Sequence, residues 1–197
     1  MAAIAGCNGS GRLEVLSLNT VAIDPPAPAS YRFDPQRCYW WKNEDGGLSI
    51  AMQSDQSNWF SPLGKGSLKL SLVLKEMPAG RARNYSVGPR EVRASYALGL
   101  WQHRFTSLRG IVGVSLEKDG RIKGAFRVWM LHHPGPGLFT LFPPSPGEVL
   151  FFGDLRAVRD NDGKGRRILA ETESQGWDRK SQFRPTSRPA DAILPTF

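Results

Sequence analysis

Three histidines are the first residues whose type suggests chemistry, because neutral imidazole is a common metal ligand. His132 and His133 are adjacent, and His103 lies elsewhere in the chain. Neighbouring residues on a strand point to opposite faces, so this adjacent pair cannot easily hold one ion. Residues 134–137 read Pro-Gly-Pro-Gly, which indicates a turn. We therefore predict no metal site and no cofactor.

Three other motifs also fail on their spacing. Residues 160–163 read Asp-Asn-Asp-Gly, but a calcium loop with Gly163 in sixth place would start at Val158 and end at Leu169. We expect a polar hairpin loop there instead. Residues 64–67 lack the earlier glycine of a phosphate-binding loop, and no Gly-x-Ser-x-Gly elbow occurs. No catalytic residue is assigned, and an enzyme ranks last among our hypotheses.

Tryptophan and basic residues together suggest a different kind of site. Trp129 should share one face of a strand with Arg121, Lys123 and Arg127, because alternate strand residues point the same way. Such a face can stack sugar rings or bases, and we name these four residues as a possible ligand face. The alternative is a tryptophan covered by a loop or by stacked arginine side chains. Trp41 similarly points away from Trp40.

The charge of the chain is strongly asymmetric. There are 26 basic and 18 acidic residues, with seven of each in residues 1–80, so the whole net charge of +8 lies in residues 81–197. Excess positive charge can attract polyanions such as nucleic acid, lipid headgroups or anionic glycans. The alternative is that exposed arginines serve solubility. An anionic polymer or glycan is therefore a candidate partner, and no specific protein partner can be inferred.

The two cysteines, Cys7 and Cys38, are too few for a disulfide framework or a tetrahedral zinc site. Cys38 falls on the apolar face of a predicted strand, where a buried thiol acts as a small hydrophobe.

The segment that ends at Cys7 is a more specific motif. Ile4-Ala5-Gly6-Cys7 places an aliphatic residue and two small residues before a cysteine, and Asn8 to Gly11 follows as a small polar stretch. This segment resembles the lipobox of bacterial lipoproteins. The resemblance implies that Cys7 is lipidated and that the next residues form a tether to the membrane lipid. It departs from the pattern because only three residues precede Ile4, so a basic start and a longer apolar stretch are missing.

Alternation and turn residues predict the elements that position these side chains. Leucines at 68, 70, 72 and 74 alternate with polar residues, as in a half-buried strand. A three-residue loop ending at Gly120 pairs Val112 with Phe126 and places Gly120 in the left-handed region. A loop ending at Gly46 likewise pairs Trp40 with Ile50.

Nine or ten short strands without a long amphipathic helix predict an all-β fold. We expect a single-domain antiparallel β-sandwich, with a partly open β-barrel as the alternative and helix confined to short turns. The predicted organisation is a signal remnant and tether at 1–12, the β domain at 13–173 and a flexible C-terminal tail at 174–197.

Our first hypothesis is a non-enzymatic cell-envelope lipoprotein with a binding or structural role. It would be held on the periplasmic side by Cys7 if the start of the chain is truncated, and would otherwise be cytoplasmic. The second is a polyanion- or carbohydrate-binding module that uses the basic, tryptophan-bearing face.

Overall fold

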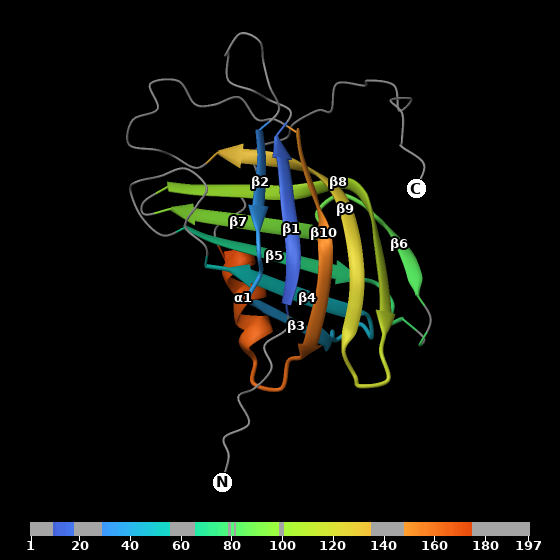
Figure 1. Ribbon diagram of the computed structural model, residues 1–197. Helices are drawn as coiled ribbons and strands as arrows, with labels where there is room; N and C mark the ends of the chain where they lie inside the picture. The colour runs from blue at the N-terminus through green and yellow to red at the C-terminus, as the bar shows by residue number, and fades with distance from the viewer. Residues whose placement is uncertain are drawn as a thin grey trace, which may run out of the picture.

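Strands dominate the protein, as the alternation predicts. The computed structural model describes residues 10–17, 29–55, 66–78, 80, 82–98, 101–134 and 148–174, which form ten strands and one helix (Figure 1). The strands are β1 (Ser10–Ser17), β2 (Ala29–Phe33), β3 (Arg37–Lys42), β4 (Leu48–Ser54), β5 (Gly66–Leu74), β6 (Arg83–Val87), β7 (Val92–Leu98), β8 (Trp101–Leu116), β9 (Ile122–Pro134) and β10 (Glu148–Arg159), and the helix is α1 (Lys164–Ser174).

Seven strands form a closed sheet in the order β3, β4, β5, β7, β8, β9 and β10. The ring closes where Val158 and Arg159 of β10 pair in parallel with Tyr39 and Trp40 of β3. All other strand pairs are antiparallel. The strands β1, β2 and β6 lie outside the ring, with β1 on β10, β2 on β1 and β6 on β8.

The all-β prediction is confirmed, but the sandwich is wrong because the sheet closes on itself as a barrel. The cause lies in the long strands, which change partners along their length. β8 pairs first with β7 and then with β6, while β9 follows its other edge. Alternation defines the two faces of a strand but does not identify its partners.

Both predicted hairpin registers are confirmed. Val112 pairs with Phe126 in the β8–β9 hairpin, and Trp40 pairs with Ile50 in the β3–β4 hairpin. Gly120 and Gly46 have φ angles of 78° and 84°, so each glycine holds the left-handed position that ends its loop.

The interior of the closed sheet is packed with side chains from nearly every strand. Leu68, Leu70 and Leu72 of β5 are at most 1% exposed and belong to this core. They pack with aromatic residues from other strands, including Phe33, Tyr96, Phe105, Phe126 and Phe151.

A bulge interrupts β8 where it leaves β7 for β6. The register with β9 shifts between Ser107 and Arg109, so that the inward positions change from odd to even residue numbers. Ser107 anchors this corner, since its hydroxyl donates to the Gly88 carbonyl at 2.6 Å and accepts from the Val92 amide at 3.0 Å. Consequently Phe105 points into the core before the bulge, as Val112 does after it.

α1 corrects the expectation that helix is confined to short turns. Residues 160–163 lead into this 11-residue helix rather than forming a hairpin loop. The Asp160 carboxylate accepts from the Arg166 amide at 3.1 Å and so satisfies one free donor of the first turn. Eleven residues with few apolar positions are ambiguous between helix and strand, and packing against the sheet resolves the choice.

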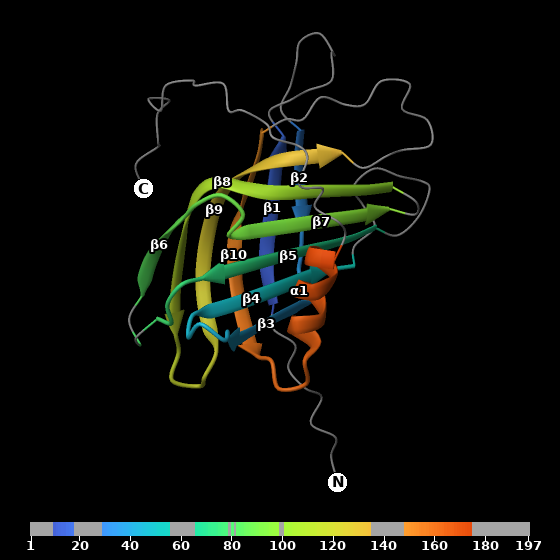
Figure 2. The same cartoon turned by 180° about the vertical axis from the view of Figure 1, so that it is seen from behind.

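Figure 2 shows α1 lying across the outer face of the sheet near β3, β4 and β5. Within the described part of the chain, no helix is long and apolar enough to cross a membrane. Residues 1–9 and 175–197 lie outside the described residues, so the tether and the C-terminal tail stay predictions.

Candidate functional site

The outer face of β9 carries three of the four residues predicted for a ligand face. Lys123, Arg127 and Trp129 alternate with residues that point into the core, so all three project outward. Lys123 is exposed, and the other two are partly exposed. Arg121 precedes the strand, and its guanidinium pairs with the Asp119 carboxylate at 3.5 Å. Arg121 therefore belongs to the turn.

Two arginines from neighbouring strands extend this face. Arg109 of β8 lies opposite Trp129, and its guanidinium carbon is 5.8 Å from the ring centroid. Arg156 of β10 lies opposite Lys123. We call Arg109, Lys123, Arg127, Trp129 and Arg156 the β9 strip. Extending the predicted hairpin register would have found Arg109, whereas Arg156 depends on the pairing of β10.

Carboxylates border the β9 strip. Glu148 lies 3.9 Å from Arg109, and Glu117 lies 3.2 Å from Arg156. Ion pairs this exposed are typically worth about 0–1 kcal/mol, so a competing anion can displace them. Asp154 of β10 is also exposed on this face, opposite Ala125 and between Lys123 and Arg127. The face is therefore of mixed sign, with a small excess of cations.

An apolar side chain lies beside the strip. Ile111 of β8 pairs with Arg127 and is 52% exposed. It is the only large hydrophobic residue in the described part of the chain that is exposed. The face thus offers an aliphatic surface, an indole ring and cationic groups together.

A second outward-pointing tryptophan among the described residues has a different environment. Trp41 of β3 is 7% exposed and packs with Tyr39, Ala51 and Ile168. Ile168 belongs to α1, which lies over this part of the sheet. The alternative of a covered tryptophan therefore holds for Trp41, though the cover is a helix rather than a loop. Its other form, a stacked arginine side chain, applies to Trp129, because Arg109 lies over that ring.

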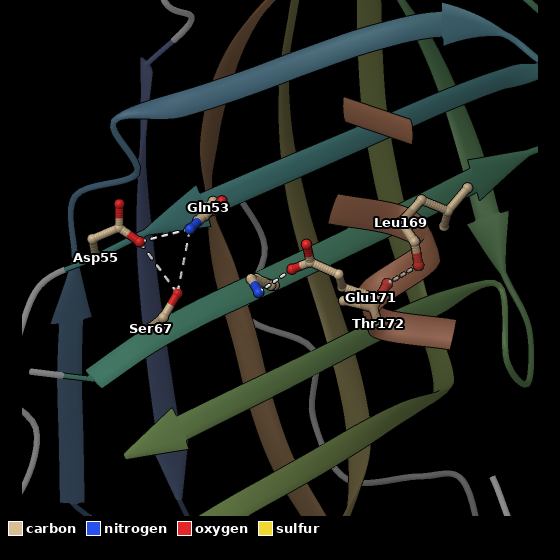
Figure 3. A network of polar contacts seen from close by, with 7 residues as sticks. Gln53, Asp55, Ser67, Leu169, Glu171 and Thr172 are labelled. Carbon is tan, nitrogen blue, oxygen red and sulfur yellow. Dashed lines mark hydrogen bonds and ion pairs between the residues drawn. The ribbon is translucent and has the colours of Figure 1, made fainter. Parts of the chain in front are cut away.

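Polar contacts fix α1 over the sheet, as Figure 3 shows. Lys69 of β5 pairs with Glu171, and the Thr172 hydroxyl donates to the Ser71 hydroxyl at 3.2 Å. A second cluster joins Gln53, Asp55 and Ser67 at the ends of β4 and β5. The outer face of β4 and β5 is thus occupied by the protein's own helix.

A groove of about 350 Å³ lies beside the second half of α1, over β5 and the turn before β7. Its charged walls form ion pairs, with Lys75 3.8 Å from Glu91 and Arg93 2.8 Å from Glu173. Because most of these charges already have partners, we assign no ligand to the groove.

The histidines are placed in a way that adjacency in the sequence does not show. His132 and His133 do point to opposite faces, and His133 Nε2 lies 2.9 Å from the Thr106 hydroxyl. However, His103 of β8 reaches the inward side of β9, where its Nδ1 lies 2.9 Å from Nε2 of His132. Two imidazoles from adjacent strands therefore meet at one end of the closed sheet.

Burial keeps this imidazole pair neutral. Burial, together with smaller contributions from the neighbouring His103 and His133, lowers the pKa of His132 to about 4. Burial also lowers the pKa of His103. Rings of Phe105 and Tyr96 surround the pair, at centroid distances of 4.9 Å from His132 and 6.3 Å from His103.

The two cysteines lie in different parts of the chain, and the structure describes one of them, Cys38. Cys38 is a free thiol, fully buried in the core, and burial raises its pKa, so it acts as a small hydrophobe. Cys7, the predicted lipidation site, lies outside the described residues.

Comparisons with known proteins do not assign the chain to a family. No protein-family model, no curated protein and no solved structure matches the chain.

Proposed function

We propose that the protein binds an anionic polysaccharide on the β9 strip. The observation that carries this proposal is the alignment of Lys123, Arg127 and Trp129 on one open strand face, with Arg109 beside the indole. Indole rings stack on the apolar faces of sugar rings, and the cations attract carboxylate or sulfate groups on the same polymer.

The spacing along β9 supports an extended ligand. Lys123 and Arg127 are four residues apart, which corresponds to about 13 Å along a strand. Trp129 continues the line two residues further. A polymer lying along β9 would therefore meet two cations and then an aromatic platform.

The carboxylates near the strip favour a polysaccharide over nucleic acid. Double-stranded DNA carries about one charge per 1.7 Å, so Glu117 and Glu148 would repel it strongly. Many anionic polysaccharides have fewer charges per unit length than DNA, and their sugar rings offer apolar faces. Ile111 and Trp129 suit such a ligand, because both offer apolar contact area beside the charged groups.

Lipid anchoring through Cys7 also remains a proposal, supported by the lipobox resemblance. The three residues from Cys7 to Ser10 span at most about 10 Å, and Ser10 pairs with Arg156 of the β9 strip. An anchored protein would thus present the strip close to the envelope surface. Feeding labelled palmitate to a bacterial host that expresses the gene from an upstream start tests this, and Cys7→Ser should abolish the label.

The binding proposal is tested by affinity for heparin and dextran sulfate at low salt. Lys123→Gln combined with Arg127→Gln should weaken binding by about tenfold or more, since each 1.4 kcal/mol corresponds to a factor of ten. Trp129→Ala should weaken binding to sulfated dextran about fivefold without changing the net charge.

The matched control is Lys42→Gln combined with Lys75→Gln, which removes the same charge from exposed residues elsewhere. Equal weakening in both double variants would mean that the net charge alone acts, and would contradict the proposal. Tighter binding of single-stranded DNA than of heparin would identify nucleic acid as the ligand instead.

A further inference from the structure

We propose that His103 and His132 bind a divalent late first-row transition-metal ion, such as Zn²⁺ or Cu²⁺. The site lies on the inward face of the sheet, at the end where β8 begins and β9 ends. It is separate from the β9 strip, because it uses the opposite face of β9.

The separation of the two facing nitrogens suits a shared ion. Nδ1 of His103 and Nε2 of His132 are 2.9 Å apart. Imidazole nitrogens lie about 2.0–2.1 Å from zinc, so two ligands on one ion are roughly 2.9–3.4 Å apart for angles between octahedral and tetrahedral. Each ring must turn away from the line of the hydrogen bond for both lone pairs to point at one ion.

The protonation state of the pair also suits a metal. One proton sits between the facing nitrogens and forms their hydrogen bond. On metal binding, this proton moves to the other nitrogen of the same ring, so both facing nitrogens donate lone pairs and neither ring changes its charge.

The surroundings determine which ions fit. Among the described residues, no third His, Cys, Asp or Glu joins the pair, so water completes the coordination. Nitrogen ligands favour Zn²⁺, Cu²⁺ and Ni²⁺ over Mg²⁺ and Ca²⁺, which prefer oxygen. Both histidines keep partial exposure, which leaves a route for the ion to enter.

The bulge in β8 is what brings this pair together. Without the register shift between Ser107 and Arg109, the inward positions would stay even, and His103 would point to the outer face. With it, His103 lies on the same side as His132, whose ring stacks on Phe105.

The first experiment uses the unmodified protein and ring-proton NMR during titration with Zn²⁺. The chain has three histidines, so each ring can be followed separately. The signals of His103 and His132 should shift together, while those of His133, which points to the other face, should stay in place. Shifts of all three rings, or of none, would overturn the proposal and leave a hydrogen bond between strands as the role of the pair.

The second experiment compares His103→Gln and His132→Gln with His133→Gln as the matched control. Loss of either proposed ligand should weaken Cu²⁺ binding by at least about tenfold, since even changes to groups behind a metal ligand cost 10–100-fold. His133→Gln should change it less than twofold. Electron paramagnetic resonance of the Cu²⁺ complex should show coupling to two nitrogens, and equal affinity in all three variants would contradict the site.

Discussion

Trp41 and Trp129 both point outward from the same closed sheet, but one is buried and the other stays partly exposed. Trp41 is packed under α1 against Tyr39 and Ile168, whereas Trp129 stays partly exposed with Arg109 beside its ring. The local sequence does not separate them, because each alternates with core residues along its strand. The difference comes from a helix that follows β10 and folds back over one side of the barrel.

Glycines mark the same contrast between the two faces. At Gly165 of α1, an added Cβ atom would lie 2.7 Å from the Cβ of Tyr39 and 2.9 Å from Cζ3 of Trp41. At Gly113 of β8, on the open face, the nearest atom is the amide oxygen of the exposed Asn84. The face under α1 is therefore packed like the core, whereas the open face can accommodate an added methyl group if an exposed side chain moves.

The largest expected effect is that of Trp41→Ala. It should lower the free energy of unfolding by about 3–5 kcal/mol, because it empties a packed space between sheet and helix. Trp129→Ala should lower it by about 1 kcal/mol or less, since this ring lies at the surface. Urea denaturation of both variants makes the comparison, and similar losses would show that the two faces do not differ.

The next largest effect is that of Gly165→Ala. Alanine favours a helix by about 1 kcal/mol over glycine, yet we expect a net loss of about 1–2 kcal/mol because the methyl group would overlap Tyr39 and Trp41. Thermal and urea unfolding measure this. A stabilised variant would mean that α1 lies further from the sheet.

Gly113→Ala is the control on the open face. The side chain of Asn84 can rotate away, so we expect a change within about 0.5 kcal/mol. A large loss here would show that the outer face of β8 is as tightly packed as the face under α1.

A smaller effect should follow from Asp160→Ala at the start of α1. The variant loses the hydrogen bond from the Arg166 amide, which typically costs about 1 kcal/mol. Asp162→Ala is the control, because its pair with Lys164 is exposed and contributes about 0.5 kcal/mol or less. Equal losses would mean that charge near the helix, rather than capping, matters.

The smallest effect should be that of Arg156→Gln on the open face. Its ion pair with Glu117 is exposed, so the free energy of unfolding should change by less than about 0.5 kcal/mol. The same variant should weaken retention on heparin. If the variant is stable and its retention on heparin is unchanged, Arg156 does not contribute to binding.

The hairpins were predictable because their information is local. An Asp-Gly turn and the alternation on either side suffice to pair Val112 with Phe126, and this register also implies Arg109 opposite Trp129. By contrast, α1 was missed, because residues 164–174 show a weak apolar pattern that suits a helical turn or a strand.

The histidine pair was missed for a different reason. The rule that adjacent residues point to opposite faces correctly separates His132 from His133. It does not show that His103 lies beside His132, because that contact needs the bulge at Ser107, which is held by the Gly88 carbonyl and the Val92 amide.

The sequence alone determined the all-β class, the two Asp-Gly hairpins and the outward direction of Lys123, Arg127 and Trp129. These depend on alternation and on glycine's access to positive φ, which are properties of a few neighbouring residues. Only the tertiary structure decided the closure of the sheet, the covering of Trp41 and the meeting of His103 with His132. Each of these joins segments far apart in the chain, and their pairing is selected by burial of a shared core rather than by any local preference.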